Sequence, residues 1–326
     1  MKQRRLVWLA IFLAWVAFPY RSPAPLIYTP GEGWRYEKAG GEGKWLRTRA
    51  KDQLDVAQKA FDAKDYSQAR KAARRTVAQW PFSDYAPQAQ YVLARSEEAL
   101  GNEERAFKEF QKLVEKYPKI DNYDDALKQQ FTIANHYLAG KWFRVLGTLP
   151  LFPSMDRTIK YYEQIVKSGP YSSVGAQAQM NIGAAHEKKL AKDYPEAARA
   201  YERVADRYND QPIAAEAIYK AGQAYLKQAK TAEYDQSISA QAIATFTDFN
   251  TLYPDSDKVP ETKKAISSLK TEQARGSFDI AHFYDKRRLW EGAQIYYNEV
   301  LIKDPDSKLA EEARRRIEGI KKRLQK

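Results

Sequence analysis

The sequence predicts an all-α protein in which antiparallel helix pairs stack side by side into a repeat array. The composition favours helices around a packed core, because 44% of the 326 residues are hydrophobic while Gly and Pro number only 15 each. Alanines and aromatic residues at helical spacing form a pattern that returns from residue 45 to the C-terminal region. In most copies of the pattern a proline follows the second helix and ends it. One helix pair cannot bury its apolar stripe alone, so the recurrence predicts a solenoid.

We interpret residues 1–24 as a signal peptide or a short N-terminal anchor. Basic residues at positions 2, 4 and 5 precede the uncharged run Leu6–Phe18. Its 13 residues suit the apolar core of a signal peptide and are too few to span a bilayer comfortably. Ser22-Pro23-Ala24 offers the small residues of a cleavage site. Both alternatives, cleavage and retention as an anchor, predict export.

Residues 25–44 are expected to form a linker. Five glycines lie between residues 26 and 44, and the segment has no helical period, although a small ordered patch is expected around Trp34 and Tyr36. The remaining residues, 45–326, are assigned to a single repeat domain.

The repeated unit consists of a small residue, an aromatic residue four positions later, an aliphatic pair and a closing proline. The small positions are Ala69, Ala106, Ala197, Ala242 and Ala293, the aromatic positions include Phe110, Tyr201, Phe246 and Tyr297, and Thr158 with Tyr162 forms a less regular copy. Small side chains allow two helices to approach closely, and the aromatic rings fill the space toward the next helix. The prolines at 81, 118, 170, 254 and 305 are expected to end the second helix of each pair.

Two insertions interrupt the repeats, and a polar segment follows them. Ala139–Pro153 is apolar and is expected either to pack against the repeats or to form a contact loop, with Trp142–Pro153 facing a partner or a membrane surface. Lys230–Ser239 is polar and is expected to be a surface loop. Ala310–Leu324 is polar on its outer face, which predicts a capping helix.

The pattern resembles the tetratricopeptide repeat from residue 45 to about residue 320. This resemblance implies a right-handed superhelical solenoid of about six helix pairs with a C-terminal capping helix. The export signal, the number of units and the stretches 278–290, 293–297 and 303–307 are more narrowly similar to the BamD (YfiO) family. That family belongs to the machinery that assembles outer-membrane β-barrel proteins. The chain departs from the family because it has no cysteine to carry a lipid.

The BamD resemblance implies a scaffold in the periplasm, or at the periplasmic face of the outer membrane, of a Gram-negative-type bacterium. Its partners would be an outer-membrane assembly subunit or unfolded outer-membrane protein segments. The late repeat would dock on the barrel-inserting subunit through Phe278, His282, Tyr284, Arg287, Arg288 and Trp290. The alternative is a periplasmic tetratricopeptide adaptor for the Tol-Pal system or for peptidoglycan-linked processes.

The first helices of tetratricopeptide pairs line a groove that binds peptide segments. Transferring the repeat register predicts that this groove contains Leu54, Gln58, Phe61, Gln88, Tyr91, Arg95, Phe131 and Asn135. The alternative for the aromatic residues is packing in the core, and for Arg95 and Asn135 it is plain exposure to solvent.

The sequence contains no recognised motif for catalysis or cofactor binding. His136, His186 and His282 lie in separate repeats, and Leu190 stands where a zinc protease needs its second histidine after His186-Glu187. The absence of cysteine excludes disulfides and thiol catalysis. The net charge of +12 is spread over alternating acidic and basic residues, so no nucleic-acid partner is expected. We expect a binding protein without cofactor, metal or enzymatic activity; the alternative is an enzyme whose site is assembled across repeats.

Overall fold

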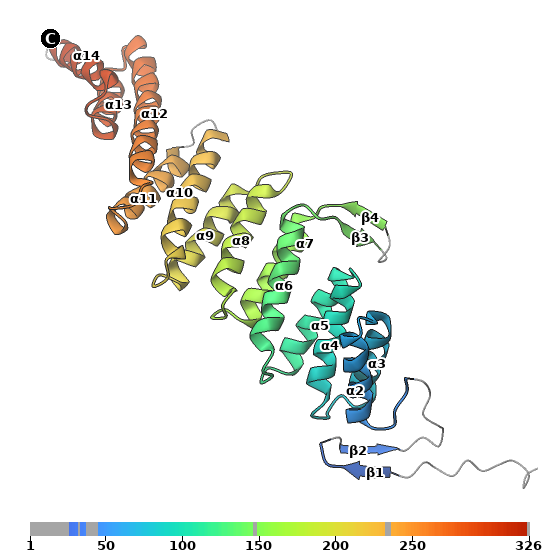
Figure 1. Cartoon of the computed structure of the whole chain (residues 1–326). Coiled ribbons are helices and arrows are strands. Elements are labelled where there is room, and N and C mark those ends of the chain that lie inside the picture. Colours follow the sequence, from blue (N-terminus) through green and yellow to red (C-terminus); the bar gives the residue numbers. More distant parts are fainter. Residues whose placement is uncertain (1–25, 32, 37–44, 146–148, 232–235, 325–326) are drawn as a thin grey trace, which may run out of the picture. The chain divides into compact units, whose positions relative to one another are not determined.

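The computed structural model describes residues 26–31, 33–36, 45–145, 149–231 and 236–324 (Figure 1). These ranges contain thirteen helices, α2 to α14, and two two-stranded antiparallel sheets. The predicted signal segment, 1–24, and most of the glycine-rich stretch before residue 45 lie outside the described residues. The chain divides into two compact units, Met1–Ala126 and Leu127–Lys326.

The first unit holds a hairpin and two complete helix pairs. Strands β1 (Leu26–Thr29) and β2 (Gly33–Tyr36) pair antiparallel, so the ordered patch expected around Trp34 is the second strand of a hairpin. The helix pairs are α2 (Ala50–Asp62) with α3 (Tyr66–Gln79) and α4 (Ala86–Ala99) with α5 (Glu103–Lys116). Helix α6 (Tyr123–Leu138) begins in this unit and continues into the second.

The second unit contains the rest of α6 and the remaining helices. Helix α7 (Met155–Ser168) follows α6, and the next pairs are α8 (Gly175–Lys188) with α9 (Tyr194–Arg207), α10 (Ile213–Thr231) with α11 (Gln236–Leu252), and α12 (Val259–Lys286) with α13 (Trp290–Lys303). The last helix, α14 (Lys308–Leu324), packs on α13 as the predicted cap.

The insertion between α6 and α7 forms a second hairpin, β3 (Phe143–Val145) with β4 (Leu149–Phe152). The buried ring of Phe143 stacks on Tyr137 with 4.0 Å between centroids and meets the edge of Tyr161 at 5.7 Å. The guanidinium of Arg157 lies 4.0 Å from the Phe143 ring centroid. The insertion is therefore anchored by packing at Phe143, while Trp142 is 52% exposed. Membrane contact through Trp142–Pro153 stays a prediction.

The surface loop expected over Lys230–Ser239 is wrong for the residues of this stretch that the structure describes, because all of them are helical. Helix α10 continues through Thr231, and α11 already begins at Gln236. The helices extend this far because apolar residues at helical spacing continue on both sides. Ala229, Ala242 and Leu269 form a buried cluster, and Ile238 packs against it.

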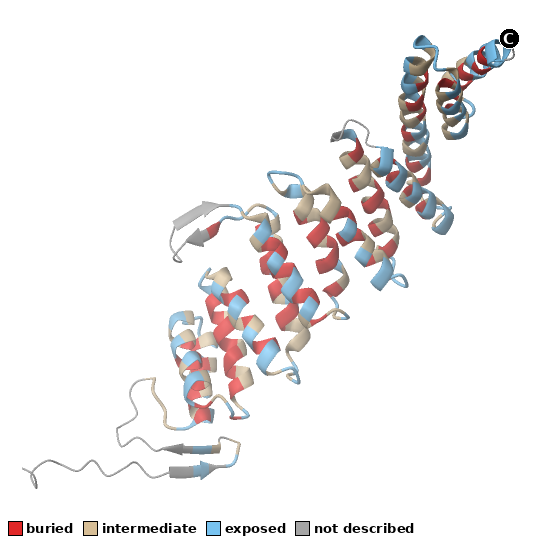
Figure 2. Cartoon of the chain, turned by 180° about the vertical axis from the view of Figure 1, so that it is seen from behind, coloured by how far each residue is buried: buried red, intermediate tan, exposed pale blue. Residues whose placement is uncertain are grey.

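Small residues lie where paired helices approach most closely, as predicted. Buried residues follow the sides of the helices that face one another within each unit (Figure 2). Ala197 and Ala293 are completely buried. A methyl group added to Gly183 of α8 would lie 2.5 Å from the ring of Tyr201 on α9, and one added to Gly222 would lie 2.5 Å from the ring of Phe246. These distances leave no room for a larger residue at either position.

The closing prolines do more than end helices. The hydroxyl of Tyr117, at the end of α5, donates a hydrogen bond of 3.0 Å to the carbonyl oxygen of Pro81, which follows α3. Tyr208, at the end of α9, donates in the same way to Pro170 at 2.7 Å. Each bond joins the end of one helix pair to the end of the preceding pair, so the aromatic residue and the proline together hold the register between repeats.

Replacing Gly183 with alanine is expected to lower the free energy of unfolding by about 1–3 kcal/mol, because the new methyl group overpacks the contact with Tyr201. Gly319→Ala is the matched control, since Gly319 lies in helix α14 with nothing within 4 Å of an added Cβ. This control should gain up to about 1 kcal/mol from helix propensity. Urea unfolding followed by circular dichroism measures both variants. Equal changes of the same sign in the free energy of unfolding of both variants would show that packing against Tyr201 does not require glycine at position 183.

Candidate protein-interaction surface

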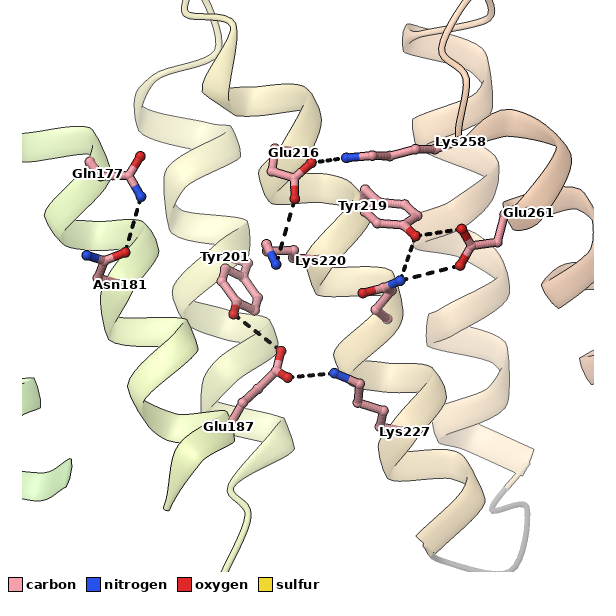
Figure 3. A network of polar contacts seen from close by, with 11 residues as sticks. Gln177, Asn181, Glu187, Tyr201, Glu216, Tyr219, Lys220, Lys227, Lys258 and Glu261 are labelled. Atoms are coloured by element: carbon pink, nitrogen blue, oxygen red, sulfur yellow. Dashed lines mark hydrogen bonds and ion pairs between the residues drawn. The ribbon is translucent and has the colours of Figure 1, made fainter. Parts of the chain in front are cut away.

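The first helices of successive pairs in the second unit carry a continuous set of polar side chains (Figure 3). We call this set the first-helix face. It comprises Gln177, Asn181 and Glu187 on α8, Glu216, Tyr219, Lys220, Gln223 and Lys227 on α10, and Lys258 and Glu261 at the start of α12. The side chains recur at spacings of three, four and seven residues on α10, which places them on one side of that helix.

Glu187 is held from two sides. Tyr201 of α9 donates its hydroxyl hydrogen to Glu187 Oε1 at 3.2 Å, and Lys227 Nζ of α10 lies 2.6 Å from Glu187 Oε2. The Tyr201 side chain is almost fully buried, and this burial, followed by the charge of Glu187, raises the pKa of the phenol above its usual range. The phenol therefore stays protonated near neutral pH and continues to donate to the carboxylate.

A second polar cluster joins α10 to α12. The hydroxyl of Tyr219 donates to Glu261 at 2.8 Å, and the amide of Gln223 donates to the Tyr219 oxygen at 2.6 Å. Lys258 forms an ion pair with Glu216, and its ammonium nitrogen lies 4.5 Å from the centroid of the Tyr219 ring. Burial, followed by the hydrogen bond to Glu261, raises the pKa of Tyr219 to about 12.

A pocket of about 330 Å³ opens between α8, α9 and α10. Its lining combines polar and apolar side chains: Gln177, Met180, Asn181, Ala184, Tyr201, Ile213, Glu216 and Lys220. The amide of Gln177 can donate to and accept from a peptide backbone, while Met180, Ala184 and Ile213 can contact an apolar side chain. The arrangement is suited to binding a polypeptide segment.

The groove residues predicted on α2 differ from one another in their surroundings. Leu54 and Phe61 pack, partly buried, against the core cluster of Ala57, Ala72, Ala73, Val92 and Leu93, which matches the packing alternative for Phe61. The amide of Gln58 donates to Asp62 on the exposed side of α2.

On α4, Gln88, Tyr91 and Arg95 lie on one side of the helix. The hydroxyl of Tyr91 donates to Asp125 of α6 at 2.6 Å, Gln88 accepts from Asn122 at 3.3 Å, and Arg95 lies 3.4 Å from Glu98. Burial and the hydrogen bond to Asp125 raise the pKa of Tyr91 to about 12. The contact between a first-helix tyrosine and a carboxylate of the next first helix therefore occurs in both units.

The two remaining predicted groove residues lie in the second unit. The ring of Phe131 meets the edge of Tyr162 with 5.9 Å between centroids. Asn135 Oδ1 accepts hydrogen bonds from the Tyr162 hydroxyl at 2.6 Å and from the Asn181 amide at 2.9 Å. Asn135 thus extends the first-helix face onto α6.

The predicted docking residues of the late repeat lie on the last part of α12, in the turn after it and at the start of α13. Phe278 meets Tyr297 at 5.4 Å, Tyr284 stacks on Tyr296 at 5.5 Å, and Arg323 lies 4.8 Å from the Trp290 ring. His282 lies 6.4 Å from Phe278, between centroids, and Arg288 takes a φ of 60° in the turn. Tyr297 is fully buried, and the other aromatic residues are partly buried against the core cluster that contains it.

The exposed part of the late repeat includes a residue that the prediction omitted. Phe283 is 51% exposed, and the guanidinium of Arg287 lies 3.5 Å from its ring centroid. Leu289 and Ile295 are also exposed nearby in the sequence, at 51% and 60%. Phe283 lies between the predicted residues His282 and Tyr284, so the aromatic character of this stretch could have led to its inclusion in the predicted docking set.

Within the described ranges, no group of three or more His, Asp or Glu residues is arranged to hold a metal ion. None of the helices described is both long and apolar enough to cross a membrane. His186 Nδ1 instead lies 3.2 Å from Asp193, beside the turn between α8 and α9.

Stacked antiparallel helix pairs with a polar, pocketed first-helix face define a tetratricopeptide-type scaffold for protein interactions. Residues 54–119 match the tetratricopeptide repeat family. Residues 153–326, more than half of the chain, match the YfiO family, which is described as an outer membrane lipoprotein, and the chain therefore belongs to that family. The predicted fold class and the predicted relation to the BamD (YfiO) family are confirmed.

The chain is also similar to solved tetratricopeptide repeat structures. The C-terminal part of a repeat protein from Cytophaga hutchinsonii has 14% identity and a TM-score of 0.35, with 81% of this chain and 87% of that chain covered. A repeat protein from Parabacteroides merdae has 10% identity and a TM-score of 0.32, with coverages of 82% and 98%. A third, from Thermus thermophilus, has 17% identity and a TM-score of 0.28, with coverages of 67% and 98%. None of the curated proteins compared with the chain matches it.

The raised pKa of Tyr219 predicts how stability depends on alkaline pH. Below pH 10 the phenol is protonated in both the folded and the unfolded chain, so its full contribution is present. Between pH 10 and about 12 the unfolded chain ionises first, and the free energy of unfolding falls by at most about 1.4 kcal/mol per pH unit for this one proton.

Tyr219→Phe is therefore expected to destabilise the chain at pH 8 and to make the decline between pH 10 and 12 shallower. Urea unfolding at a series of pH values measures the difference between the wild type and the variant. Tyr171→Phe is the control because the Tyr171 ring is 83% exposed on the turn before α8. An equal change in the pH slope for both variants would contradict the assigned Tyr219–Glu261 contact.

Proposed function

We propose that this chain is a protein-interaction scaffold of outer-membrane β-barrel assembly that works on the periplasmic side of the outer membrane. The observation that carries the proposal is the YfiO family match, because residues 153–326 include most of the first-helix face and the whole late repeat. Tetratricopeptide and YfiO proteins act by binding, which favours a scaffold over an enzyme. The partner is accordingly a polypeptide, either an assembly subunit or an unfolded outer-membrane protein segment.

The first-helix face supports the binding of a polypeptide segment. Its three glutamates and three lysines are paired internally, as with Glu187 and Lys227 or Glu216 and Lys258. A segment lying across the face can exchange these pairs for contacts of its own and can place a side chain in the pocket beside Tyr201. The amide of Gln177 then forms hydrogen bonds with the backbone of the segment.

The late repeat supports the docking of a folded subunit. Aromatic residues and arginine contribute most to protein interfaces, and Phe283 with Arg287 presents both on the exposed side of α12. The stacked pair of Tyr284 and Tyr296 lies next to it and holds the turn in place. A rigid support of this kind lowers the cost of ordering the interface on binding.

The family description and the predicted export segment support a location in the cell envelope. None of the 326 residues is a cysteine, so the sequence offers no thiol for lipid attachment. We propose that association with the membrane uses the N-terminal apolar segment, Leu6–Phe18, instead.

Photocrosslinking in cells tests the proposed function. A photoreactive amino acid replaces Phe283 in the late repeat or Lys220 on the first-helix face, and Tyr171 serves as an exposed control position. We expect Phe283 to capture a large outer-membrane assembly subunit and Lys220 to capture unfolded outer-membrane protein, with neither product at Tyr171. Capture of Tol-Pal or peptidoglycan-linked proteins at both test positions would replace this function with the adaptor alternative.

The purified subunit captured at Phe283 allows a quantitative measurement. Phe283→Ala is expected to weaken its binding about tenfold or more, because the change removes an aromatic contact and the support of Arg287. Leu190→Ala, in the exposed turn after α8, is the matched control and should leave the dissociation constant unchanged. Calorimetry measures the two dissociation constants, and the melting temperatures of both variants should be unchanged. Equal dissociation constants would show that Phe283 does not contribute to the interface.

A further inference from the structure

The N-terminal hairpin displays an aromatic pair to solvent. Tyr28 of β1 and Trp34 of β2 are register partners, and their ring centroids lie 5.3 Å apart. The two residues are 58% and 69% exposed. Exposed aromatic area held in one place by a strand pair indicates a surface used for contact.

The hairpin is attached to the first repeat. The carbonyl oxygen of Gly31, in the hairpin turn, accepts a hydrogen bond of 2.8 Å from the backbone N–H of Asp84, which precedes α4. Gly31 has a φ of 79°, and a methyl group in its place would lie 3.1 Å from the Asp84 carboxylate. Two residues before Asp84, Phe82 is 98% exposed. The aromatic pair and Phe82 therefore belong to the same end of the first unit.

Charge and chain length indicate what lies against this end. From the start of the hairpin to residue 51 the sequence has six basic residues and three acidic ones, a net positive charge that attracts anionic phospholipid headgroups. The apolar run Leu6–Phe18 ends only seven residues before β1, a separation of at most roughly 30 Å even for extended chain. Any membrane that receives this run is thus brought to the hairpin at high local concentration.

We infer that Tyr28, Trp34 and Phe82 form a membrane-surface contact whose ligand is a bilayer containing anionic phospholipid. Trp and Tyr prefer the headgroup level of a bilayer, because their rings are apolar and each carries one polar group that stays hydrated. The net positive charge of the sequence between residues 26 and 51 adds electrostatic attraction to such a bilayer. This contact goes beyond the proposed assembly function, since it needs no protein partner and lies in the other unit from the late repeat.

The test uses the full-length chain and its lack of cysteine. Pro30→Cys introduces one thiol beside the aromatic pair, and Tyr171→Cys introduces one at an exposed site in the second unit. An environment-sensitive fluorophore on each thiol is mixed with vesicles of phosphatidylethanolamine and phosphatidylglycerol, or of phosphatidylcholine alone. Quenching by lipids labelled near the headgroup reports contact with the interface.

We expect a blue shift and lipid quenching at position 30 with the anionic vesicles, a weaker response with phosphatidylcholine, and none at position 171. Replacing Tyr28, Trp34 and Phe82 together with serine should abolish the response at position 30. Because this variant could also unfold the hairpin, the swap of Tyr28→Trp with Trp34→Tyr is tested beside it and should retain the response.

Three results would overturn the inference. The first is vesicle binding of the full chain without any change at position 30, which would assign binding to the apolar run alone. The second is an equal response at positions 30 and 171. The third is a shift at position 30 that grows with protein concentration in the absence of vesicles, which would identify a second copy of the chain as the ligand.

Discussion

The contact between a residue without a bulky side chain and an aromatic ring on the paired helix organises the second unit. Gly183 of α8 lies directly against the ring of Tyr201, so α8 and α9 approach closely and the ring is buried between them. The same ring carries its hydroxyl to Glu187, one helical turn after Gly183. Core packing and the orientation of a surface carboxylate thus depend on one side chain, and the first-helix face is positioned by the core beneath it.

Tyrosine hydroxyls also connect successive repeats. Tyr117 and Tyr208 reach back to the carbonyl groups of the prolines that close the preceding pairs. Tyr91 and Tyr219 reach forward to carboxylates on the next first helix. A phenol is long enough to cross between neighbouring helices and donates a single hydrogen, which suits it to this role. The repeats are consequently joined by directional bonds as well as by apolar packing.

The helix pairs and the cap could be predicted from the sequence because small residues, aromatic residues and prolines recur at fixed spacing. The start of α11 at Gln236 could not be predicted from the sequence, because its first residues are polar and resemble a loop. Its helical conformation is explained by the contact of Ile238 with the buried cluster that includes Leu269 of α12. For the site, repeat register assigned Tyr91 and Asn135 to the binding groove, and this assignment stays a prediction, although both residues make polar contacts between helices. Register alone did not indicate that Leu54 packs partly buried against the core or that Tyr219 bonds to Glu261, because both contacts depend on side chains of neighbouring helices.

The internal pairing of the first-helix face has a kinetic consequence. Each glutamate of the face already has a lysine or tyrosine hydrogen-bonded to it, as Glu261 has Tyr219. An arriving segment gains only the difference between the contacts it makes and the contacts it displaces. When it leaves, the original pairs re-form at once and no buried charge is stranded. In the proposed function, such a surface favours short residence times for a bound polypeptide segment.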